Sequence, residues 1–380
     1  MSDNKNLKPG WKVWRFEQMA TNVNVRIDNP SESGMEHYVG LEHLDADSLK
    51  IRRWGTPDDV EATKLMFKKG DIIFGRRRAY QRKLGVAEFD GICSAHAMVL
   101  RPKPDVVLPE FLPFFMQSDL FMSRAVEISV GSLSPTINWK TMAVQEFSLP
   151  PLSQQSKVTE LFLAIDAAVE EHRLLIASIE AAQKAMLIDD LGKGWKTKRI
   201  SEIGNVITGK TPPTGNPDCW GSEIPFATPA DLAFDTGHLA CVERSISKIG
   251  SSYSRVAPAG ATLVVCIGST IGKVAQTIGS TAFNQQINAI VCHSVDPDYF
   301  YAVSTTIGSE LSKRSGTTAV PIINKGEFEK IEIPIPPYES QVEIAGRFNE
   351  FTESKKASKV RLNDLLSLRA KAIQGFAGGE

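Results

Sequence analysis

Two long segments of the chain carry apolar residues at alternating spacings of three and four. The first follows the prolines at 150–151 and runs to Gly192, with His172 as the polar residue at its midpoint. This heptad pattern predicts a long helix with a coiled-coil seam. The prolines fix its entry, Ser153 is placed to cap its first turn, and Gly192 and Gly194 end it. The predicted seam consists of Val158, Leu161, Ile165, Ala168, His172, Leu175, Ile179, Ala182 and Met186.

A second segment of the same kind begins after "PIPPYES" (334–340) and carries more polar interruptions. If the two helices pair antiparallel in matched register, His172 lies opposite Ser358, and such a polar layer would fix the register. The alternative, two amphipathic helices that each pack on their own domain, stays open. The predicted positions of the second seam are Ile344, Phe348, Phe351, Lys355, Ser358, Leu362, Leu365, Arg369 and Ala372.

The two helical segments belong to a duplication. "SLPPLSQQSKVTELF" (148–162) returns as "PIPPYESQVEIAGRF" (334–348), "LKPGWKVWR" (7–15) returns as "LGKGWKTKR" (191–199), and "PTINWK" returns as "PIINK". Shared borders with divergent interiors differ from the short units of a solenoid. We therefore expect two variable blocks, 1–150 and 192–335, followed by helical spacers at 151–191 and 336–380.

The variable blocks are rich in short alternating apolar runs, turns and prolines. Strands are predicted at 71–75, 85–89 and 97–102 in the first block and at 261–267 and 287–293 in the second, with helical stretches such as 108–126 between them. The predicted fold class is α+β. Two globular, sheet-rich mixed α/β domains are separated by two long antiparallel, coiled-coil-like helices with pseudo-two-fold symmetry.

Composition narrows the class of protein. With 42% hydrophobic and 23% charged residues, the chain has the make-up of a soluble globular protein. Its five scattered cysteines, without a CxxC pair, argue against a disulfide framework or a zinc site. The polar N-terminus and the lack of a long apolar run lead us to expect a cytoplasmic protein. Because the net charge is −1, any nucleic-acid surface must be a local patch.

The most basic stretch of the first block is "GRRRAYQRK" (75–83), between two predicted strands. Arginine and lysine on such a loop can straddle phosphates or reach guanine edges, although a solvated surface loop is the alternative. The candidate DNA-binding residues of this block are Arg52, Arg53, Arg76, Arg77, Arg78, Tyr80, Gln81, Arg82, Lys83, Ser94, His96, Asn138 and Lys140.

The second block is less basic and richer in amides. Read as one strand, residues 283–291 place Asn284, Gln286 and Asn288 on one face, and such amides can grip adenine. Satisfaction of buried backbone near a turn is an equally good interpretation. The candidate DNA-binding residues of this block are Lys210, Thr211, Thr214, Ser269, Thr270, Lys273, Asn284, Gln285, Gln286, Lys313 and Arg314.

Enzyme motifs are incomplete throughout. "GSTIGKV" (268–274) lacks one residue between its glycines and the hydroxyl residue that a phosphate-binding loop needs. "NPDC" (216–219) lacks the aromatic of an adenine methyltransferase loop, and "PDDVEATK" (57–64) has the wrong spacing for a nuclease. The six histidines are isolated, so no metal site is expected. We predict a non-catalytic chain.

The doubled order of motifs resembles the DNA specificity subunits of Type I restriction–modification systems. The resemblance rests on "GWKVWR" and "GWKTKR", on residues 67–103, and on the Pro-Pro phrases that follow "PTINWK" and "PIINK". It covers essentially the whole chain and is looser in the second half.

The resemblance implies two target recognition domains that each read one half of a split, asymmetric DNA site, with the helices setting the gap. Two modification subunits carrying S-adenosylmethionine would dock around the helices, and restriction subunits using ATP and Mg would join them. No cofactor is expected on this chain. A scaffold that binds only proteins, and a specificity subunit of a methylation-only or related defence system, are the alternatives.

Overall fold

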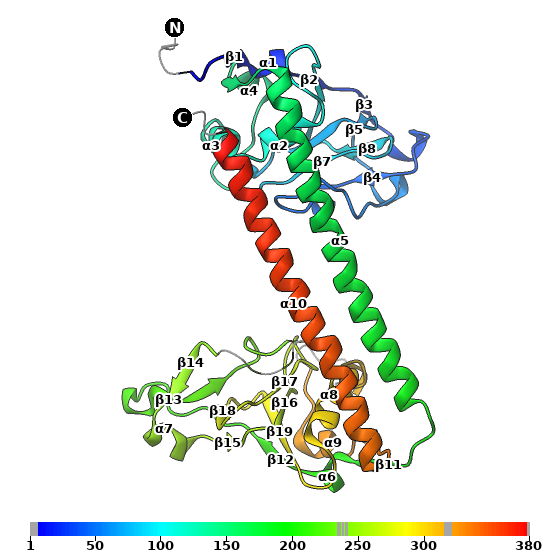
Figure 1. Ribbon diagram of the computed structural model, residues 1–380, viewed down its shortest axis with the longest axis vertical. Helices are drawn as coiled ribbons and strands as arrows, with labels where there is room; N and C mark the ends of the chain where they lie inside the picture. The colour runs from blue at the N-terminus through cyan, green and yellow to red at the C-terminus, as the bar shows by residue number, and fades with distance from the viewer. Residues whose placement is uncertain (1–6, 234–236, 238, 240–241, 315–320, 378–380) are drawn as a thin grey trace. The chain divides into compact units, whose positions relative to one another are not determined.

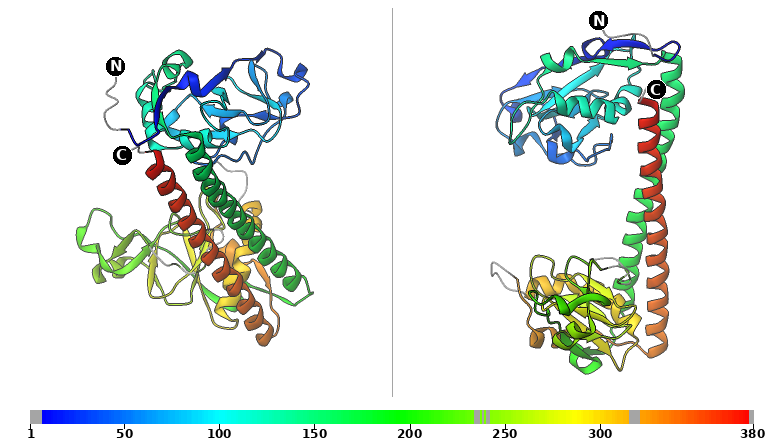
Figure 2. Two further views of the ribbon diagram at one scale, coloured as in Figure 1. Left: turned by 45° about the horizontal axis from the view of Figure 1, so that its top comes forward. Right: turned by 90° about the vertical axis from the view of Figure 1, so that its left-hand side faces the viewer.

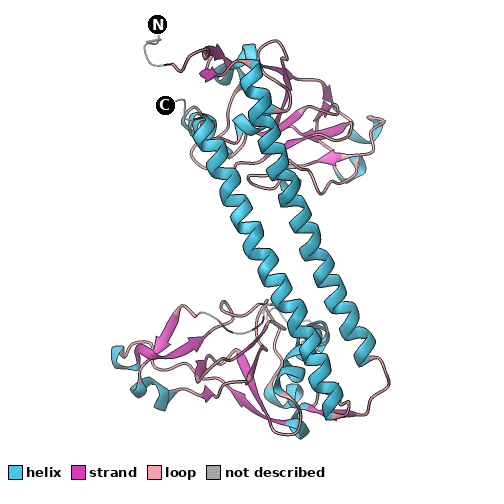
Figure 3. Ribbon diagram, in the orientation of Figure 1, coloured by secondary structure: helices cyan, strands magenta, loops and turns pink. Residues whose placement is uncertain are grey.

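The chain folds into two compact units. The computed structural model describes residues 7–233, 237, 239, 242–314 and 321–377. Unit 1 comprises residues 1–172 together with 361–380, and unit 2 comprises residues 173–360. Figures 1 and 3 show that each unit combines small sheets with parts of two long helices, α5 (Leu152–Leu191) and α10 (Tyr338–Ala377).

Unit 1 contains two four-stranded sheets and one strand pair. The first sheet is ordered β2 (Ala20–Val23), β9 (Ala97–Pro102), β6 (Ile72–Gly75) and β7 (Leu84–Val86). The second is ordered β3 (Arg26–Ile27), β5 (Lys64–Phe67), β8 (Gly91–Ser94) and β4 (Tyr38–Val39), and β1 (Lys12–Arg15) pairs with β10 (Glu146–Leu149). Its short helices are α1 (Phe16–Met19), α2 (Phe111–Met116), α3 (Asp119–Glu127) and α4 (Trp139–Ala143), with 3₁₀ turns at Pro30–Glu32, Leu41–His43, Pro57–Asp59 and Ala79–Gln81.

Unit 2 repeats this plan. Its first sheet is ordered β12 (Gly204–Thr208), β19 (Ile287–Cys292), β16 (Thr262–Val265) and β17 (Val274–Gln276). The second is ordered β14 (Arg244–Ile246), β13 (Trp220–Ala227), β18 (Thr281–Phe283) and β15 (Val256–Ala257), and β11 (Thr197–Arg199) pairs with β20 (Glu332–Pro334). Its other helices are α6 (Ile200–Ile203), α7 (Lys248–Tyr253), α8 (Pro297–Arg314) and α9 (Lys325–Glu329), with a 3₁₀ turn at Pro217–Cys219.

The duplication therefore extends into the variable blocks as topology, even where the sequence similarity has been lost. In both units the first sheet is fully antiparallel, and in the second sheet one strand pair is parallel, β4 with β8 and β13 with β18. The first sheets of the two blocks share one topology, whereas in the second sheets the parallel pair lies at the edge in unit 1 and in the middle in unit 2.

Apolar residues on the central strands explain the two-sided cores. In β6, Ile72 and Phe74 enter one core cluster and Ile73 enters another on the opposite face. In β16, Leu263 and Val264 divide in the same way between two clusters. Because successive side chains of a strand alternate between faces, a continuous apolar run lets each sheet be covered on both sides.

Each unit draws the near ends of both long helices into its core. In unit 1, Phe162 of α5 and Ile373 of α10 join the cluster around Phe16. In unit 2, Leu187 of α5 and Phe348 of α10 join the cluster around Tyr299. The two helices run antiparallel and side by side within each unit, as Figure 2 also shows. They are thus paired and also packed on the blocks, so the two predicted alternatives are not exclusive.

The predicted register between the helices is wrong in unit 1. With His172 opposite Ser358, Asp364 would lie opposite Asp166. The observed partner of Asp166 is Arg369, whose guanidinium it accepts from. The shift replaces two facing carboxylates by an ion pair at a buried position, which favours it electrostatically.

The predicted seam on the first helix is also wrong at three positions, Leu161, Leu175 and Ala182, whose side chains are exposed. Leu161 and Leu175 are about half exposed, at 54% and 46%. The buried face instead follows the next residue along, through Phe162, Val169 and Ile176. A residue step of 100° separates these two faces, and the side that meets both the block and the partner helix is selected by packing rather than by the apolar pattern alone. Ser153 lies inside the helix and not at its cap.

A buried glutamine anchors each long helix to its block. Gln155 is fully buried, accepts from the Leu108 amide (2.9 Å) and donates to the Pro150 carbonyl (3.0 Å). Its counterpart Gln341 accepts from the Asp296 amide (2.9 Å) and donates to the Pro336 carbonyl (2.9 Å). The glutamine shared by "LSQQ" and "YESQ" is therefore a structural lock.

Replacing this lock is expected to loosen unit 1 locally. In Gln155→Leu the Leu108 amide loses its acceptor, and a buried unsatisfied group costs about 1–3 kcal/mol. Hydrogen exchange of peptides that cover residues 104–112 should accelerate, while those around Asp296 keep their protection. The control is Gln154→Leu, because that neighbour is exposed. Equal protection in both variants would contradict the anchoring role.

Candidate nucleic-acid interface

The basic loop of the first block is held in a defined shape. Gly75 donates to the Lys83 carbonyl (2.9 Å), which closes the loop between β6 and β7. The Arg78 amide donates to Pro135 (2.7 Å), and the Ile137 amide donates to Arg76 (3.0 Å). The "PTINWK" phrase thus forms one wall of this loop.

The second block builds the same backbone frame from different residues. Val265 donates to the Lys273 carbonyl (2.9 Å), and the amides of Gly268 and Ile323 bond to Pro321 and Cys266 (3.0 and 2.9 Å). These bonds align Arg78 with Gly268, and the left-handed residue Arg82 with the left-handed Gly272. The frame is shared, but Arg78 and Arg82 of the first block correspond to Gly268 and Gly272 of the second.

A hollow of about 300 Å³ opens beside the arginine loop. Its lining consists of Leu41, Glu42, Arg77, Arg78, Gln81, Ser94 and His96. Arg77 contacts His96 (Nη1 to Nε2, 3.3 Å) and donates to the Ser134 hydroxyl (3.2 Å). Among the described residues no carboxylate forms an ion pair with Arg76, Arg77 or Arg78. Five of the residues predicted to bind DNA come together here.

Some of the cations predicted to bind DNA form ion pairs within unit 1. Arg52 pairs with Asp45 and with Glu170 of α5 and thus ties the block to the helix. Arg82 pairs with Asp47 and Asp119. These two arginines, and Lys83 below, thus have internal acceptors, and their contact with DNA stays a prediction.

The other cations and polar residues of the first block divide in the same manner. Lys83 donates to the Leu41 carbonyl (2.6 Å), and Arg53 pairs with Asp45 while remaining 57% exposed. Arg76 donates to the Ala95 carbonyl (3.1 Å), and its buried Nε has no partner. Tyr80 is 55% exposed. Asn138 and Lys140 are also exposed, at the start of α4.

Burial lowers the pKa of His96, and the nearby charges of Arg77, Arg76 and Lys64 lower it further. The imidazole is therefore neutral near pH 7. An incoming phosphate would oppose the cations and favour the protonated ring.

The second block gathers amides where the first gathers arginines. The Thr211 hydroxyl donates to Gln285 (2.7 Å), and Asn284 donates to Gln286 (3.0 Å) in the turn between β18 and β19. Lys210, Thr214, Gln285 and Ser269 are exposed, and Thr270 is half-buried. Lys273 donates to the Pro229 carbonyl (3.2 Å), so its ammonium is engaged within the fold.

The prediction of one continuous strand over 283–291 is wrong. β18 ends at Phe283 and β19 begins at Ile287, so Asn284 and Gln286 lie in a turn. Asn288 is buried and accepts from the Thr208 hydroxyl (2.8 Å). Asn288 bonds to side chains in the interior, whereas Asn284 accepts from the Gln286 amide in the turn (3.1 Å), as the alternative interpretation held for that residue. The side chains of Lys313 and Arg314 lie outside the described residues.

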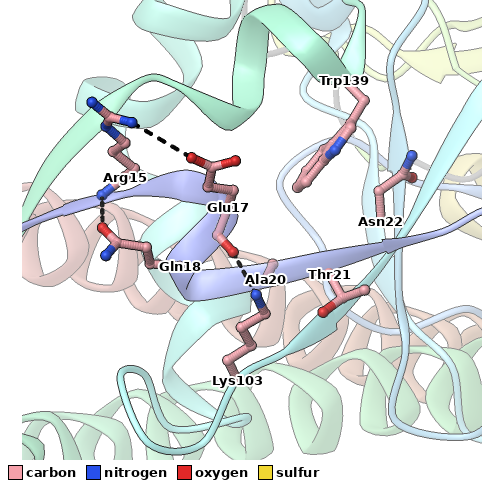
Figure 4. Close-up of a pocket in the computed structure, with 8 residues that line it drawn as sticks. All are labelled: Arg15, Glu17, Gln18, Ala20, Thr21, Asn22, Lys103 and Trp139. Carbon is pink, nitrogen blue, oxygen red and sulfur yellow. Dashed lines mark hydrogen bonds and ion pairs between the residues drawn. The ribbon is translucent and has the colours of Figure 1, made fainter.

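A second hollow, of about 520 Å³, lies beside α1 and was missed by the sequence reasoning. Figure 4 shows Arg15, Glu17 and Gln18 on one side and Asn22, Lys103 and Trp139 around the rest. Lys103 donates to the Glu17 carbonyl (2.7 Å), and Gln18 accepts from the Arg15 amide (2.8 Å). The exposed arginine of "GWKVWR" was the signal that could have indicated it.

In the parts of the chain that the structure describes, three cysteine thiols are protonated at neutral pH. Burial raises the pKa of the Cys93, Cys266 and Cys292 thiols to about 12, so none of them is a thiolate at neutral pH. No group of three or more His, Cys, Asp or Glu side chains is arranged for a metal ion among the described residues. Within the same residues, no helix has the length and apolar character needed to cross a membrane.

Comparison with known proteins decides the family. Residues 54–181 and 192–366 both match the family described as the Type I restriction modification DNA specificity domain. The chain belongs to this family. The two matches, one per half of the chain, confirm the resemblance seen in the motifs. Members of this specificity family are the non-catalytic subunits of their systems, which agrees with the prediction of a non-catalytic chain.

Relatives and solved structures agree in fold and extent. The Type I restriction enzyme HindI specificity subunit of Haemophilus influenzae is 22% identical over 94% of this chain and 97% of its own length. The MjaIX specificity subunit of Methanocaldococcus jannaschii is 32% identical over 44% of this chain and 41% of its own. The solved Type I S subunit of M. genitalium matches 99% of this chain and 98% of its own, with a TM-score of 0.64 and 12% identity. The specificity-family fold predicted from the sequence is therefore confirmed.

DNA binding by the basic loop should depend on pH through His96. Because its pKa lies below the ordinary value in the free protein, the negative charge of a bound duplex should raise it, and the ring should take up a proton on binding. Affinity for a mixed-sequence duplex at low salt should then rise as pH falls from 7 to 5.5, by at most about tenfold per pH unit for one proton. Fluorescence anisotropy measures this.

The matched comparison is between His96→Gln and His293→Gln, an exposed histidine of unit 2. The first should flatten the pH dependence and the second should keep it. An unchanged slope in His96→Gln would remove this histidine from the interface.

Proposed function

We propose that this specificity subunit recognises a split, asymmetric DNA sequence, with one half-site read by each block. The observation that carries the proposal is the shared loop frame with unlike side chains: arginines 76–78 in the first block, and Gly268 with the amides of Gln285 and Gln286 in the second. Arginine pairs with guanine edges, and glutamine or asparagine with adenine. Two loops with the same backbone frame and different side chains are expected to recognise two different half-sites.

We place the first reading surface at the hollow lined by Arg77, Arg78, Gln81, Ser94 and His96, together with Tyr80. The second lies at the turn of Asn284–Gln286 with Thr211, Lys210, Thr214, Ser269 and Thr270. These groups are at least partly exposed, apart from Asn284, and are held by short backbone connections rather than by long flexible loops. Preorganised donors of this kind are what direct readout requires.

Two modification subunits are proposed as partners, docked at the duplicated borders. The exposed cations Lys12 and Arg15 lie at the ends of β1 in the first half. In the second half Arg199 ends β11 and Lys196 directly precedes that strand. The fold explains Gly10 and Gly194, which have positive φ, but gives these cations no internal role beyond a weak Arg15–Glu17 pair (3.8 Å). Because the same surface occurs at the start of each half of the chain, it can bind two copies of one partner.

The modification subunits would supply S-adenosylmethionine and adenine methylation, since this chain carries no cofactor motif. Restriction subunits that use ATP and Mg would complete a nuclease. A methylation-only assembly uses the same specificity subunit and the same surfaces.

Co-expression with the methyltransferase subunit tests the proposal directly. Mapping of N6-methyladenine across the host genome should give one bipartite motif with two unlike halves and a fixed gap. If the two proteins associate and no new methylation appears, the chain is a protein-binding scaffold and the DNA proposal fails.

The amide turn should control the second half alone. In Gln285→Ala the exposed amide is lost, while Thr211 and the backbone of the turn stay in place. We expect degeneracy at one or two positions of one half-site, with roughly tenfold to a hundredfold less discrimination there. The control Gln154→Ala, at an exposed position of α5, should leave the methylation map unchanged. Degeneracy in both halves would contradict the assignment of one half-site per block.

A further inference from the structure

Arg78 occupies a backbone conformation that its side chain does not favour. Its φ is 57°, in the left-handed region, where a non-glycine residue is strained. The second block has glycine at the aligned position, Gly268, with φ of 99°. The left-handed backbone conformation at this position of the loop favours glycine, yet the first block has an arginine there.

Internal contacts do not account for that arginine. Arg82, in the same left-handed region at φ of 53°, is held by Asp47 and Asp119, so its strain is offset by ion pairs. The exposed side chain of Arg78 makes one long hydrogen bond, from Nε to the Ser134 hydroxyl at 3.3 Å. Backbone strain that no strong internal contact offsets indicates that the Arg78 side chain binds a ligand.

The surroundings of Arg78 match the edge of a guanine–cytosine pair better than a bare phosphate. The hollow also contains Gln81, His96 and one carboxylate, Glu42. A carboxylate repels phosphate, but it can accept from the amino group of cytosine N4, while arginine donates to guanine O6 and N7. The hollow therefore combines the donors of Arg78 with the acceptor Glu42, which is the combination that the major-groove edge of that base pair requires.

We propose that Arg78 reads a guanine in the half-site of the first block, with Glu42 accepting from the paired cytosine. This inference rests on the proposed function and names the base pair that one residue pair selects. The second block has Gly268 at the aligned position and reads its half-site without such a contact.

The test is Arg78→Gly, which installs the residue that the second block uses and relieves the strain, so loss of folding is not expected. The variant is co-expressed with the methyltransferase subunit, and N6-methyladenine is mapped genome-wide. We expect methylation to persist while one guanine in one half of the motif becomes degenerate, with discrimination there falling roughly tenfold to a hundredfold. The gap and the other half should not change. Glu42→Gln should relax the same position.

The matched control is Arg255→Gly, which removes one exposed cation from unit 2 and should leave the guanine intact. A uniform loss of methylation over all motif sequences in Arg78→Gly, with a salt dependence of binding reduced by about one ion, would identify a phosphate contact and overturn the proposal. An unchanged motif would overturn it as well. If the wild-type pair gives no methylation at all, the proposed function has failed instead, so the two failures are distinguishable.

Discussion

The attachment of each long helix to its block depends on one buried glutamine. A helix N-terminus leaves backbone groups without partners, and a loop that meets it inside a protein does the same. Gln155 satisfies an amide and a carbonyl of its block at once, and Gln341 does this again in unit 2 with near-identical distances. Because such a side chain works only in one geometry, it fixes where the helix leaves the block. The prolines before it limit the backbone to that same exit.

Further along the helices, equivalent positions of the two repeats again contact each other, but through different kinds of interaction. Asp166 and Arg369 form an ion pair in unit 1, and the equivalent positions in unit 2 hold Thr352 and Gln183, which form a hydrogen bond of 2.9 Å. Arg369 is 5% exposed and also donates to the Asp47 carbonyl and to Gln117. A buried charge of this kind is tolerated because its donors are satisfied, and it contributes specificity of pairing more than stability. Arg369 thus ties the end of α10 to α5 and to the block of unit 1.

Sequence patterns were sufficient for the elements that depend on local chemistry. Periodicity predicted both long helices and the strands at residues 72–75, 97–102, 262–265 and 287–292. The resemblance of the repeated motifs to a known family indicated the family that the comparison confirms. The failures have a common origin in tertiary contacts. The buried face of α5 differs from the apolar seam because the block and the partner helix together select it, and Arg52 reaches Glu170 over a sequence separation of 118 that no motif announces. The continuous strand predicted over residues 283–291 failed because the alternation of apolar and polar residues outweighed the turn preference of Asn284, which lies between β18 and β19.

The same distinction explains why recognition can vary on this fold while the frame stays constant. In both units the loop is closed by a hydrogen bond of equal length and braced by the carbonyl of an equivalent proline, Pro135 or Pro321. These contacts use only backbone atoms, so they place no demand on the side chains between them. Where the frame does constrain a residue, at the left-handed positions of Arg78 and Gly268, the constraint favours glycine, and an arginine there must be maintained against that preference. Residues on which the loop frame places no demand can change without disturbing the fold, whereas an arginine at position 78 costs backbone strain that a glycine would avoid.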